Sequence, residues 1–332
     1  MTQIEYSTPE EVRGFAAYTE ASPLYTQLVE VVASSDELIR VLNRIENTPQ
    51  LNILFAAVQF LLDDEPDQAL CAFYPNHTDE PGPASEIGPF FIDFVVTHEE
   101  EIAEIGRTRF TQTNECLRCT ALFPAVASVP FDACHLIDVG TSAGLNLAMD
   151  RYGYRWGDLE WGADSPLILE SELRGTMVVP RDVEFISRVG LDLNPVLPTN
   201  AEDRRWLNAL IWPEENDRKP RLNAALDLVA DVPISYVAGN AVETLQSVLD
   251  GLSPGEPAVV MNSLTLNQFS VGQRESLDRV IQQARNQRDV VRVTFEVYTS
   301  PNQWPNLRVD DGTGWKEFGQ AHHHGAWVEF YA

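Results

Sequence analysis

A short glycine-rich stretch near the middle of the chain has the residue types of a catalytic or ligand-binding turn. Asp138 lies in an apolar run that predicts a buried strand, and Gly140, Ser142 and Gly144 follow it. Glycines at such a turn let a ligand approach the backbone closely, and free amides at the start of the next helix can face it. The residues from Gly144 onward predict that helix.

Two chemistries fit this turn. One is nucleotide-type cofactor binding, in which the glycines make room and a strand-end carboxylate holds a hydroxyl group. The other is serine hydrolysis, because Gly140-x-Ser142-x-Gly144 matches the G-x-S-x-G nucleophile elbow, and His322 to His324 come late enough to supply its histidine. The residues before this strand predict helices, whereas an elbow usually follows several strands. We therefore favour the cofactor site and keep the hydrolase as the alternative.

Polar residues also end three further runs that predict strands, namely Asp192, Asn240 and Asn262. The carboxyl ends of parallel strands meet at one edge of a sheet, so we expect these side chains near Asp138. Asp192 is the most specific of the three, because an acid directly after Gly-Leu and before Leu-Asn-Pro is a distinctive arrangement. Asn240 can accept a hydrogen bond through its amide oxygen.

Three residues elsewhere are candidates for proton removal or for positioning a substrate. Glu115 and Arg118 lie in a polar segment where a core helix would be apolar, so they either pair within the protein or face a ligand. Among the histidines at 322–324, at most two share a face of a strand. We select His324 as a candidate general base, since an unperturbed histidine titrates near ~6.5.

Metal binding is not expected. Consecutive histidines cannot all bind one ion, and no acid or cysteine stands at ligand spacing beside them. Cys116 and Cys119 form a lone C-x-x-C in a helical pattern with no second pair. Two buried thiols explain this spacing better than a redox or zinc site.

The elements that must position these residues fall into two regions. Residues 1–130 predict helices, with start signals at Thr8, Ser22, Ser35 and Thr48. Residues 131–332 alternate strands and helices, which predicts an α/β fold with a Rossmann-like doubly wound sheet. An insertion is expected at about 153–184, and the tail from residue 307 predicts an antiparallel strand meander.

The composition narrows the function classes. The chain of 332 residues has 50 acidic and 23 basic residues, for a net charge of -27. The absence of a basic stripe argues strongly against nucleic-acid backbone binding as the main role. A carboxylate-rich surface with only Lys219 and Lys316 as lysines is typical of a halophilic protein, because concentrated salt screens self-repulsion. No apolar run is long enough for a membrane helix and no signal peptide is expected, which favours the cytoplasm.

The strand-end motifs together resemble those of class I S-adenosylmethionine-dependent methyltransferases. They are Asp138-Val-Gly-Thr-Ser-Ala-Gly144, Gly190-Leu-Asp-Leu-Asn-Pro195, Gly239-Asn-Ala241 and Val259-Val-Met-Asn262. The resemblance implies that the glycine turn passes the methionine part of the cofactor, that Asp192 binds the ribose hydroxyls and that Asn240 meets the adenine. Ser142 replaces the usual middle glycine and Asn240 the usual acid, and the long separation of Asp138 from Asp192 requires an insertion.

The whole chain resembles the uncharacterised domain-of-unknown-function 2332 family, over roughly residues 10 to 330. The matching pieces are Gln112-Thr-Asn-Glu115 with Arg118, Gly140-Thr-Ser-Ala-Gly-Leu-Asn146 with Asp150-Arg-Tyr152, and His324-Gly-Ala-Trp327. We therefore expect a methyltransferase-like fold and methyl transfer from S-adenosylmethionine to a small molecule or another unknown acceptor. A non-catalytic ligand-binding protein on the same scaffold is the competing hypothesis, beside the hydrolase using Ser142. The oligomeric state is left open.

Overall fold

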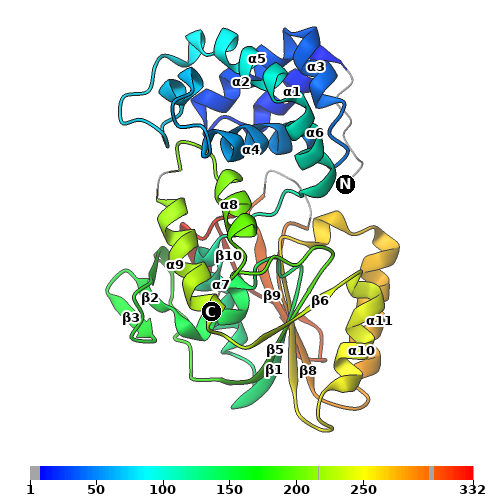
Figure 1. Ribbon diagram of the computed structural model, residues 1–332. Coiled ribbons are helices and arrows are strands. Elements are labelled where there is room, and N and C mark those ends of the chain that lie inside the picture. The colour runs from blue at the N-terminus through cyan, green and yellow to red at the C-terminus, as the bar shows by residue number, and fades with distance from the viewer. Residues whose placement is uncertain (1–7, 216, 299–302, 332) are drawn as a thin grey trace. The chain divides into compact units, whose positions relative to one another are not determined.

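The computed structural model describes residues 8–215, 217–298 and 303–331. The chain divides into two compact units, each described here by itself. The helical unit comprises Thr2–Thr113 and Ala201–Pro220, and the sheet unit comprises Asn114–Asn200 and Arg221–Ala332. The helical region expected over residues 1–130 thus corresponds to the helical unit up to Thr113, and a segment from later in the chain joins it (Figure 1).

The helical unit is built from amphipathic helices around one apolar core. Its helices are α1 (Pro9–Gly14), α2 (Pro23–Ala33), α3 (Asp36–Leu42), α4 (Gln50–Leu62), α5 (Gly88–Thr97), α6 (Glu99–Thr108) and α8 (Ala201–Ala209), with short 3-10 segments at Phe15–Tyr18, Ala69–Phe73 and Ala84–Glu86. The predicted start signals are confirmed at Thr8, which makes a capping box, and at Ser22 and Ser35, which cap α2 and α3. Each cap satisfies a backbone amide that the first turn leaves without a helical partner.

Two polar contacts hold the later segment in the helical unit. The Trp206 indole nitrogen donates to the Phe110 carbonyl at 2.9 Å, and Arg109 pairs with Asp203 at 2.7 Å. Trp206 also lies in the apolar core of this unit. A helix that is distant in the sequence therefore completes the core of the first hundred residues.

The described part of the sheet unit contains a mixed sheet of eleven strands. In chain order these are β1 (Ala133–Val139), β2 (Gly153–Trp156), β3 (Leu159–Gly162), β4 (Ile168–Gly175), β5 (Glu184–Asp192), β6 (Ile234–Ala238), β7 (Ala258–Ser263), β8 (Val290–Glu296), β9 (Asn306–Asp310), β10 (Trp315–Ala321) and β11 (Trp327–Phe330). Their spatial order is β3-β2-β4-β11-β10-β9-β8-β7-β1-β5-β6. The fold is therefore α/β, as predicted, with a larger sheet than the sequence indicates.

Five neighbouring strands, β6-β5-β1-β7-β8, run parallel. From β1 the chain first forms the inserted strands β2, β3 and β4, then returns to β5 and β6 on one side of β1 and crosses to β7 and β8 on the other. Ile137 and Val139 of β1 lie in an apolar cluster with α10 (Ala241–Gly251) and α11 (Val271–Ala284), which run side by side along these strands (Figure 1). The connections reverse direction at β1, the strand that carries Asp138.

The remaining strands extend the sheet beyond β8. β9, β10 and β11 pair antiparallel with their neighbours, which confirms the predicted meander. β4 joins β11 in parallel, β2 joins β4, and β3 closes a hairpin with β2. The inserted residues therefore lengthen the sheet. α7 (Cys119–Val126) packs against β8, β9 and β10, and α9 (Arg218–Ala230) precedes β6.

The helix predicted from Gly144 is wrong. A 3-10 segment, η5 (Leu145–Arg151), follows the glycine turn and has a kink at Ala148. The Tyr152 hydroxyl donates to the Leu145 carbonyl at 2.9 Å, and the Tyr154 hydroxyl donates to the Met149 carbonyl at 2.5 Å. These tyrosines take carbonyls that an α-helix would pair with its own amides, so the helix does not propagate.

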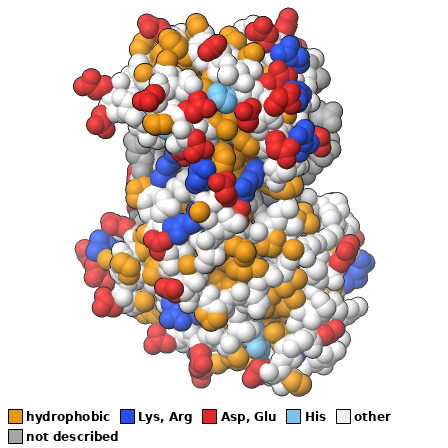
Figure 2. All heavy atoms as spheres, in the orientation of Figure 1, with side chains coloured by type: hydrophobic (Ala, Val, Ile, Leu, Met, Phe, Trp, Pro, Cys, Tyr) orange, Lys and Arg blue, Asp and Glu red, His pale blue; other side chains and the backbone are white. Residues whose placement is uncertain are grey.

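The acidic residues are distributed over the surface. Figure 2 shows Asp and Glu side chains spread across the visible face, with Arg and Lys side chains among them. No helix within the described ranges is long and apolar enough to span a membrane.

Candidate functional site

The polar residues predicted at the strand ends lie at one edge of the sheet. Asp138 pairs in register with Gly190 of β5 and Met261 of β7, and Asn262 pairs with Val139. Asp192 pairs with Ala238, directly before Gly239 and Asn240. Because these strands are parallel, all four polar residues stand at their carboxyl ends, where ligands of open α/β sheets bind.

Asp138 is a fully buried acid at the centre of this edge. Its Oδ2 accepts a long hydrogen bond of 3.4 Å from the Asn146 amide. The Thr141 hydroxyl is near enough to stabilise the charged form, but neither it nor Asp138 Oδ1 makes a hydrogen bond of good geometry with a described residue. Burial dominates and raises the pKa of Asp138 to about 7.

A second buried acid, Glu296, ends β8. Its Oε1 accepts from the Asn262 amide at 2.7 Å and from the backbone amides of Thr265 and Leu266 at 2.8 and 3.0 Å. Burial outweighs these bonds and raises the pKa of Glu296. Sequence reasoning missed this residue, because Arg292 and Thr294 interrupt the apolar residues before it and weaken the signal of a buried strand that ends in an acid.

Several buried oxygen atoms at these strand ends have no hydrogen-bond partner in the part of the chain that the structure describes. They are Oδ1 of Asp138, Oδ1 of Asn262, Oγ of Ser263 and Oε2 of Glu296. We call these four residues the strand-end cluster. They come from β1, β7 and β8, which are adjacent in the sheet. Buried polar atoms are nearly always hydrogen-bonded to the protein, to water or to a ligand, so these four oxygens are the candidate acceptors at this edge.

Arg118 brings a buried positive charge to the cluster. Its guanidinium Nε donates to the His323 carbonyl at 2.9 Å, and only 7% of the residue is exposed. Burial raises the pKa of both Asp138 and Glu296, and the positive charge of Arg118 partly offsets this rise. The structure therefore brings Arg118 close to the strand-end cluster and ties it to the histidine turn.

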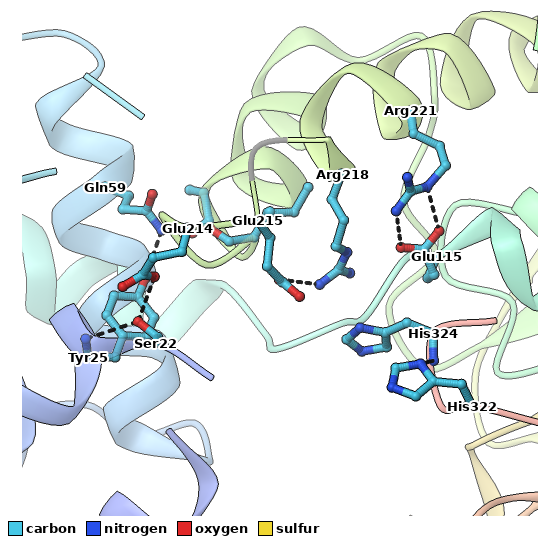
Figure 3. Close-up of polar contacts among 12 residues, drawn as sticks. Ser22, Tyr25, Gln59, Glu115, Glu214, Glu215, Arg218, Arg221, His322 and His324 are labelled. Atoms are coloured by element: carbon cyan, nitrogen blue, oxygen red, sulfur yellow. Dashed lines mark hydrogen bonds and ion pairs between the residues drawn. The ribbon is translucent and has the colours of Figure 1, made fainter. Parts of the chain in front are cut away.

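Glu115 is engaged differently. Its two carboxylate oxygens accept from Arg221 at 3.0 and 3.2 Å (Figure 3). Oε1 also accepts from the Leu117 backbone amide at 3.1 Å. This pair joins the start of η4 (Cys116–Arg118) to α9. Arg221 was not identified from the sequence, because nothing local predicts a partner about a hundred residues away.

The three histidines form the turn between β10 and β11. β10 runs in the same direction as β8, so this turn lies at the edge that carries the strand-end cluster. The His324 amide donates to Nδ1 of His322 at 3.1 Å, and Figure 3 shows both rings on one side of the turn. Gly325 packs directly on η4, since a Cβ there would lie 2.3 Å from the Leu117 carbonyl oxygen.

The glycine turn is held by acids and amides of the protein itself. Ser142 has a φ of 47°, donates its amide to Asp192 Oδ2 at 2.8 Å and accepts at Oγ from Asn114 at 2.9 Å. Asp192 Oδ1 also accepts from the backbone amide of Asn194 at 2.8 Å. Asn240 caps α10 by accepting from the Val242 amide.

The space over Gly140 and Gly144 is filled by neighbouring side chains. A Cβ at Gly140 would lie 2.2 Å from the Thr265 hydroxyl oxygen, and one at Gly144 would lie 2.6 Å from the Tyr236 hydroxyl. Both glycines also have positive φ, at 83° and 78°. The packing of the protein therefore already requires glycine here, and the pattern by itself does not indicate a ligand.

The cysteines next to the site are buried and free. Cys116 and Cys119 form no disulfide, and burial raises the pKa of the Cys119 thiol. Cys119 lies 3.6 Å from the Asn146 amide oxygen, beside the Asp138 contact. Within the described ranges, no group of His, Cys, Asp or Glu side chains could hold a metal ion.

One protein family matches almost the whole chain. Its model, described as "Uncharacterized protein conserved in bacteria (DUF2332)", covers residues 9–330. The chain belongs to this family. The match includes both units, so the helical unit is part of what the family shares. None of the curated proteins matches the chain, and the function is therefore argued from the site.

Proposed function

We propose that the strand-end cluster binds S-adenosylmethionine and that the protein transfers its methyl group to an acceptor not yet identified. The observation that carries this proposal is the concentration of four unpartnered buried oxygens at the carboxyl ends of β1, β7 and β8. The reversal of the chain connections at β1 supports it, because ligands of open α/β sheets bind where the strand order reverses.

The residues at the edge suit a cofactor with hydroxyl groups and a positive charge. Asp138, Asn262 and Glu296 offer acceptor oxygens. When ionised, the carboxylates of Asp138 and Glu296 can offset the positive charge of a sulfonium. Asp192 accepts two backbone amides and stands at the carboxyl end of β5, where the ribose hydroxyls of such a cofactor bind. Because side chains crowd Gly140 and Gly144, binding would depend on these side chains more than on close backbone approach.

Asp138 and His324 can also act as bases that remove a proton from the methyl acceptor. When bound, S-adenosylmethionine supplies a methyl group on a positively charged sulfur. Asp138, with a pKa of about 7, can take a proton from an acceptor hydroxyl or amine near neutral pH. Arg118 limits the pKa rise of Asp138 and Glu296, and His324 is a second candidate base on the same edge. Holding the reactants in line is the largest contribution such a site can make.

Calorimetry with S-adenosylmethionine in molar salt tests the proposal. We expect measurable heat and a thermal shift, with at least about tenfold weaker affinity for Glu296→Gln, because a hydrogen bond to a charged acceptor contributes ~1.5–3 kcal/mol. Asp158→Asn, an exposed acid outside the site, is the matched control and should leave affinity unchanged. The absence of heat and of a thermal shift at millimolar ligand would remove the proposal.

Two other functions are separated by further measurements. Binding without turnover across a panel of methyl acceptors would favour a non-catalytic ligand-binding protein, since a fold does not specify a function. The positive φ of Ser142 favours the hydrolase, because elbow serines sit on strained turns, but its hydroxyl bonds to Asn114. Labelling of Ser142 by a fluorophosphonate would establish the hydrolase.

A further inference from the structure

A cavity in the sheet unit lies away from the strand-end cluster. Its volume is about 460 Å³, within the range of small-molecule sites, and it is lined by Phe123, Asp150, Trp161, Gly162, Ala163, Asp182 and Val183. Val183 directly precedes β5, whose other end carries Asp192. A strand of nine residues spans roughly 30 Å at ~3.3 Å per residue, so the two sites lie at opposite edges of the sheet.

Aromatic rings form one wall of this cavity. Phe123 of α7 and Trp161 of β3 are in contact, with ring centroids 4.9 Å apart. Behind them, Tyr154 stacks on Phe123 at 5.4 Å and on Trp156 at 5.2 Å. The register of the β2–β3 hairpin places Trp161 opposite Tyr154. The wall is therefore rigid, and the half-buried Trp161 is its accessible ring.

Two carboxylates provide the charge of the lining. Oδ2 of Asp150 accepts from Arg188 at 2.6 Å, while Oδ1 is buried without a hydrogen-bond partner among the described residues. Asp182 is exposed and makes no ion pair within the ranges that the structure covers. Arg181, its neighbour in the chain, is turned to Asp132 and to the carbonyls of Ala127, Val129 and Phe131. The lining thus has acids and aromatic rings but no basic residue.

We propose that this cavity binds an organic cation, an ammonium group attached to a small apolar or hydroxylated body. A cation is attracted to the face of a tryptophan ring, and the attraction grows as water is excluded. Asp182 and the unpartnered oxygen of Asp150 add acceptors for charge or for N–H and O–H donors. An anion would meet the exposed carboxylate of Asp182, whereas the charge of Asp150 is offset by Arg188 at 2.6 Å and Arg151 at 3.5 Å. This site is independent of the proposed methyl transfer at the opposite edge.

Choline and its neutral isostere 3,3-dimethylbutan-1-ol provide the test. Both have the same shape and hydroxyl, so calorimetric affinities for the two separate charge recognition from apolar burial. We expect choline to bind about tenfold more tightly, in 0.5 M salt to screen general attraction to the acidic surface. Trp161→Ala should weaken choline binding about tenfold without altering the charge of the protein, and Asp182→Asn should weaken it several-fold.

Matched variants control for indirect effects. Trp315→Ala removes a partly exposed tryptophan on β10, and Asp158→Asn removes an exposed acid. Both should bind choline like the parent protein. If Trp161→Ala lowers the unfolding midpoint, Trp161→Phe replaces it and should retain a smaller preference for choline. Equal affinity for the two ligands, no binding at 100 mM, or equal losses in target and control variants would each overturn the proposal.

Discussion

The polar residues at the sheet edge fall into two groups that differ in how they are satisfied. At the end of β5 and after β6, Asp192 and Asn240 accept backbone amides and so fix the glycine turn and the start of α10. On β1, β7 and β8, Asp138, Asn262 and Glu296 keep buried oxygens without partners in the described chain. Glu296 shares a feature of both groups, because its Oε1 accepts the backbone amides of Thr265 and Leu266 while its Oε2 has no partner among the described residues. The first group therefore serves the fold, and the unpartnered oxygens of the second are the candidate contacts for a ligand.

This difference has a consequence for stability. An acid that accepts backbone amides stabilises the folded state, so its removal is costly. An acid that is buried without adequate partners must be desolvated when charged, so its replacement by a neutral residue relieves a cost. Asp192 and Asp138 are thus expected to give mutational effects of opposite sign.

The largest expected effect is that of Asp138→Asn at alkaline pH. Its pKa is about 7 in the folded protein against 3.8 for the ordinary residue. The folded state holds the proton of Asp138 more tightly than the unfolded chain does. Protonation of Asp138 therefore stabilises the folded state at acid pH, and this contribution is lost as pH rises from about 4 to about 7. At pH 8 the variant should be more stable than the parent by about 2–4 kcal/mol, from 1.36 kcal/mol per pKa unit.

Urea unfolding of both proteins between pH 5 and pH 9 measures this difference. The gap should grow with pH and level off above pH 8, whereas Asp158→Asn should show no such trend. A variant less stable than the parent at every pH would mean that Asp138 has internal partners as good as those of Asp192. Asp138→Asn should also lower the affinity for S-adenosylmethionine, because substitutions that stabilise a protein at a functional site often reduce its function.

Gly140→Ala tests whether the turn is held by its own packing. The new Cβ would meet the Thr265 hydroxyl at 2.2 Å, at a backbone φ of 83°. Overpacking and the left-handed conformation should together lower the free energy of unfolding by about 2–4 kcal/mol. Gly272→Ala, where a Cβ meets open space, is the control. Adding Thr265→Gly should restore part of the loss, and no restoration would show that only the backbone conformation matters.

Asp192→Ala should be destabilising by about 2–3 kcal/mol, because the amides of Ser142 and Asn194 lose a charged acceptor. If Asp192 also accepts ribose hydroxyls, affinity for S-adenosylmethionine should fall at least about tenfold. Measuring the unfolding midpoint and the affinity on the same variant distinguishes the two roles. A lower midpoint with unchanged affinity would make Asp192 purely structural.

Sequence patterns predicted the strand ends well because the apolar run and the polar residue that ends it are neighbours in the chain. An apolar run that stops at a polar residue marks the end of a buried parallel strand, and this placed Asp138, Asp192 and Asn262 at one edge. The capping residues Ser22 and Ser35 were recognised for the same reason.

The rest depends on contacts between distant segments. Tyr152 and Tyr154 end the predicted helix after the glycine turn by taking its carbonyls. Thr265, more than a hundred residues from Gly140 in the chain, fills the space that the glycine was expected to leave for a ligand. Whether the protein satisfies all the oxygens of a strand-end acid is likewise decided by such contacts, and the sequence pointed to Asp192 without identifying Glu296.

The smallest expected effect is that of Asn240→Ala. The Asn240 side chain caps α10 through the Val242 amide at 3.0 Å, and loss of a cap costs ~0.5–2 kcal/mol, typically about 1. Asn240→Asp keeps an acceptor at the cap, and its charge is favourable at a helix start, so stability should stay at the parent level. Thermal unfolding of the two variants, with S-adenosylmethionine titrations beside it, separates capping from adenine recognition.

If Asn240 only caps, Asn240→Ala lowers the unfolding midpoint while the affinity for S-adenosylmethionine stays unchanged. This outcome places Asn240 with Asp192 in the structural group. If it also meets the adenine, Asn240→Ala should weaken binding beyond any loss that Asn240→Asp produces. Equal midpoints for alanine and asparagine would show that the cap contributes nothing, and the division of the sheet edge into two groups would then fail at β6.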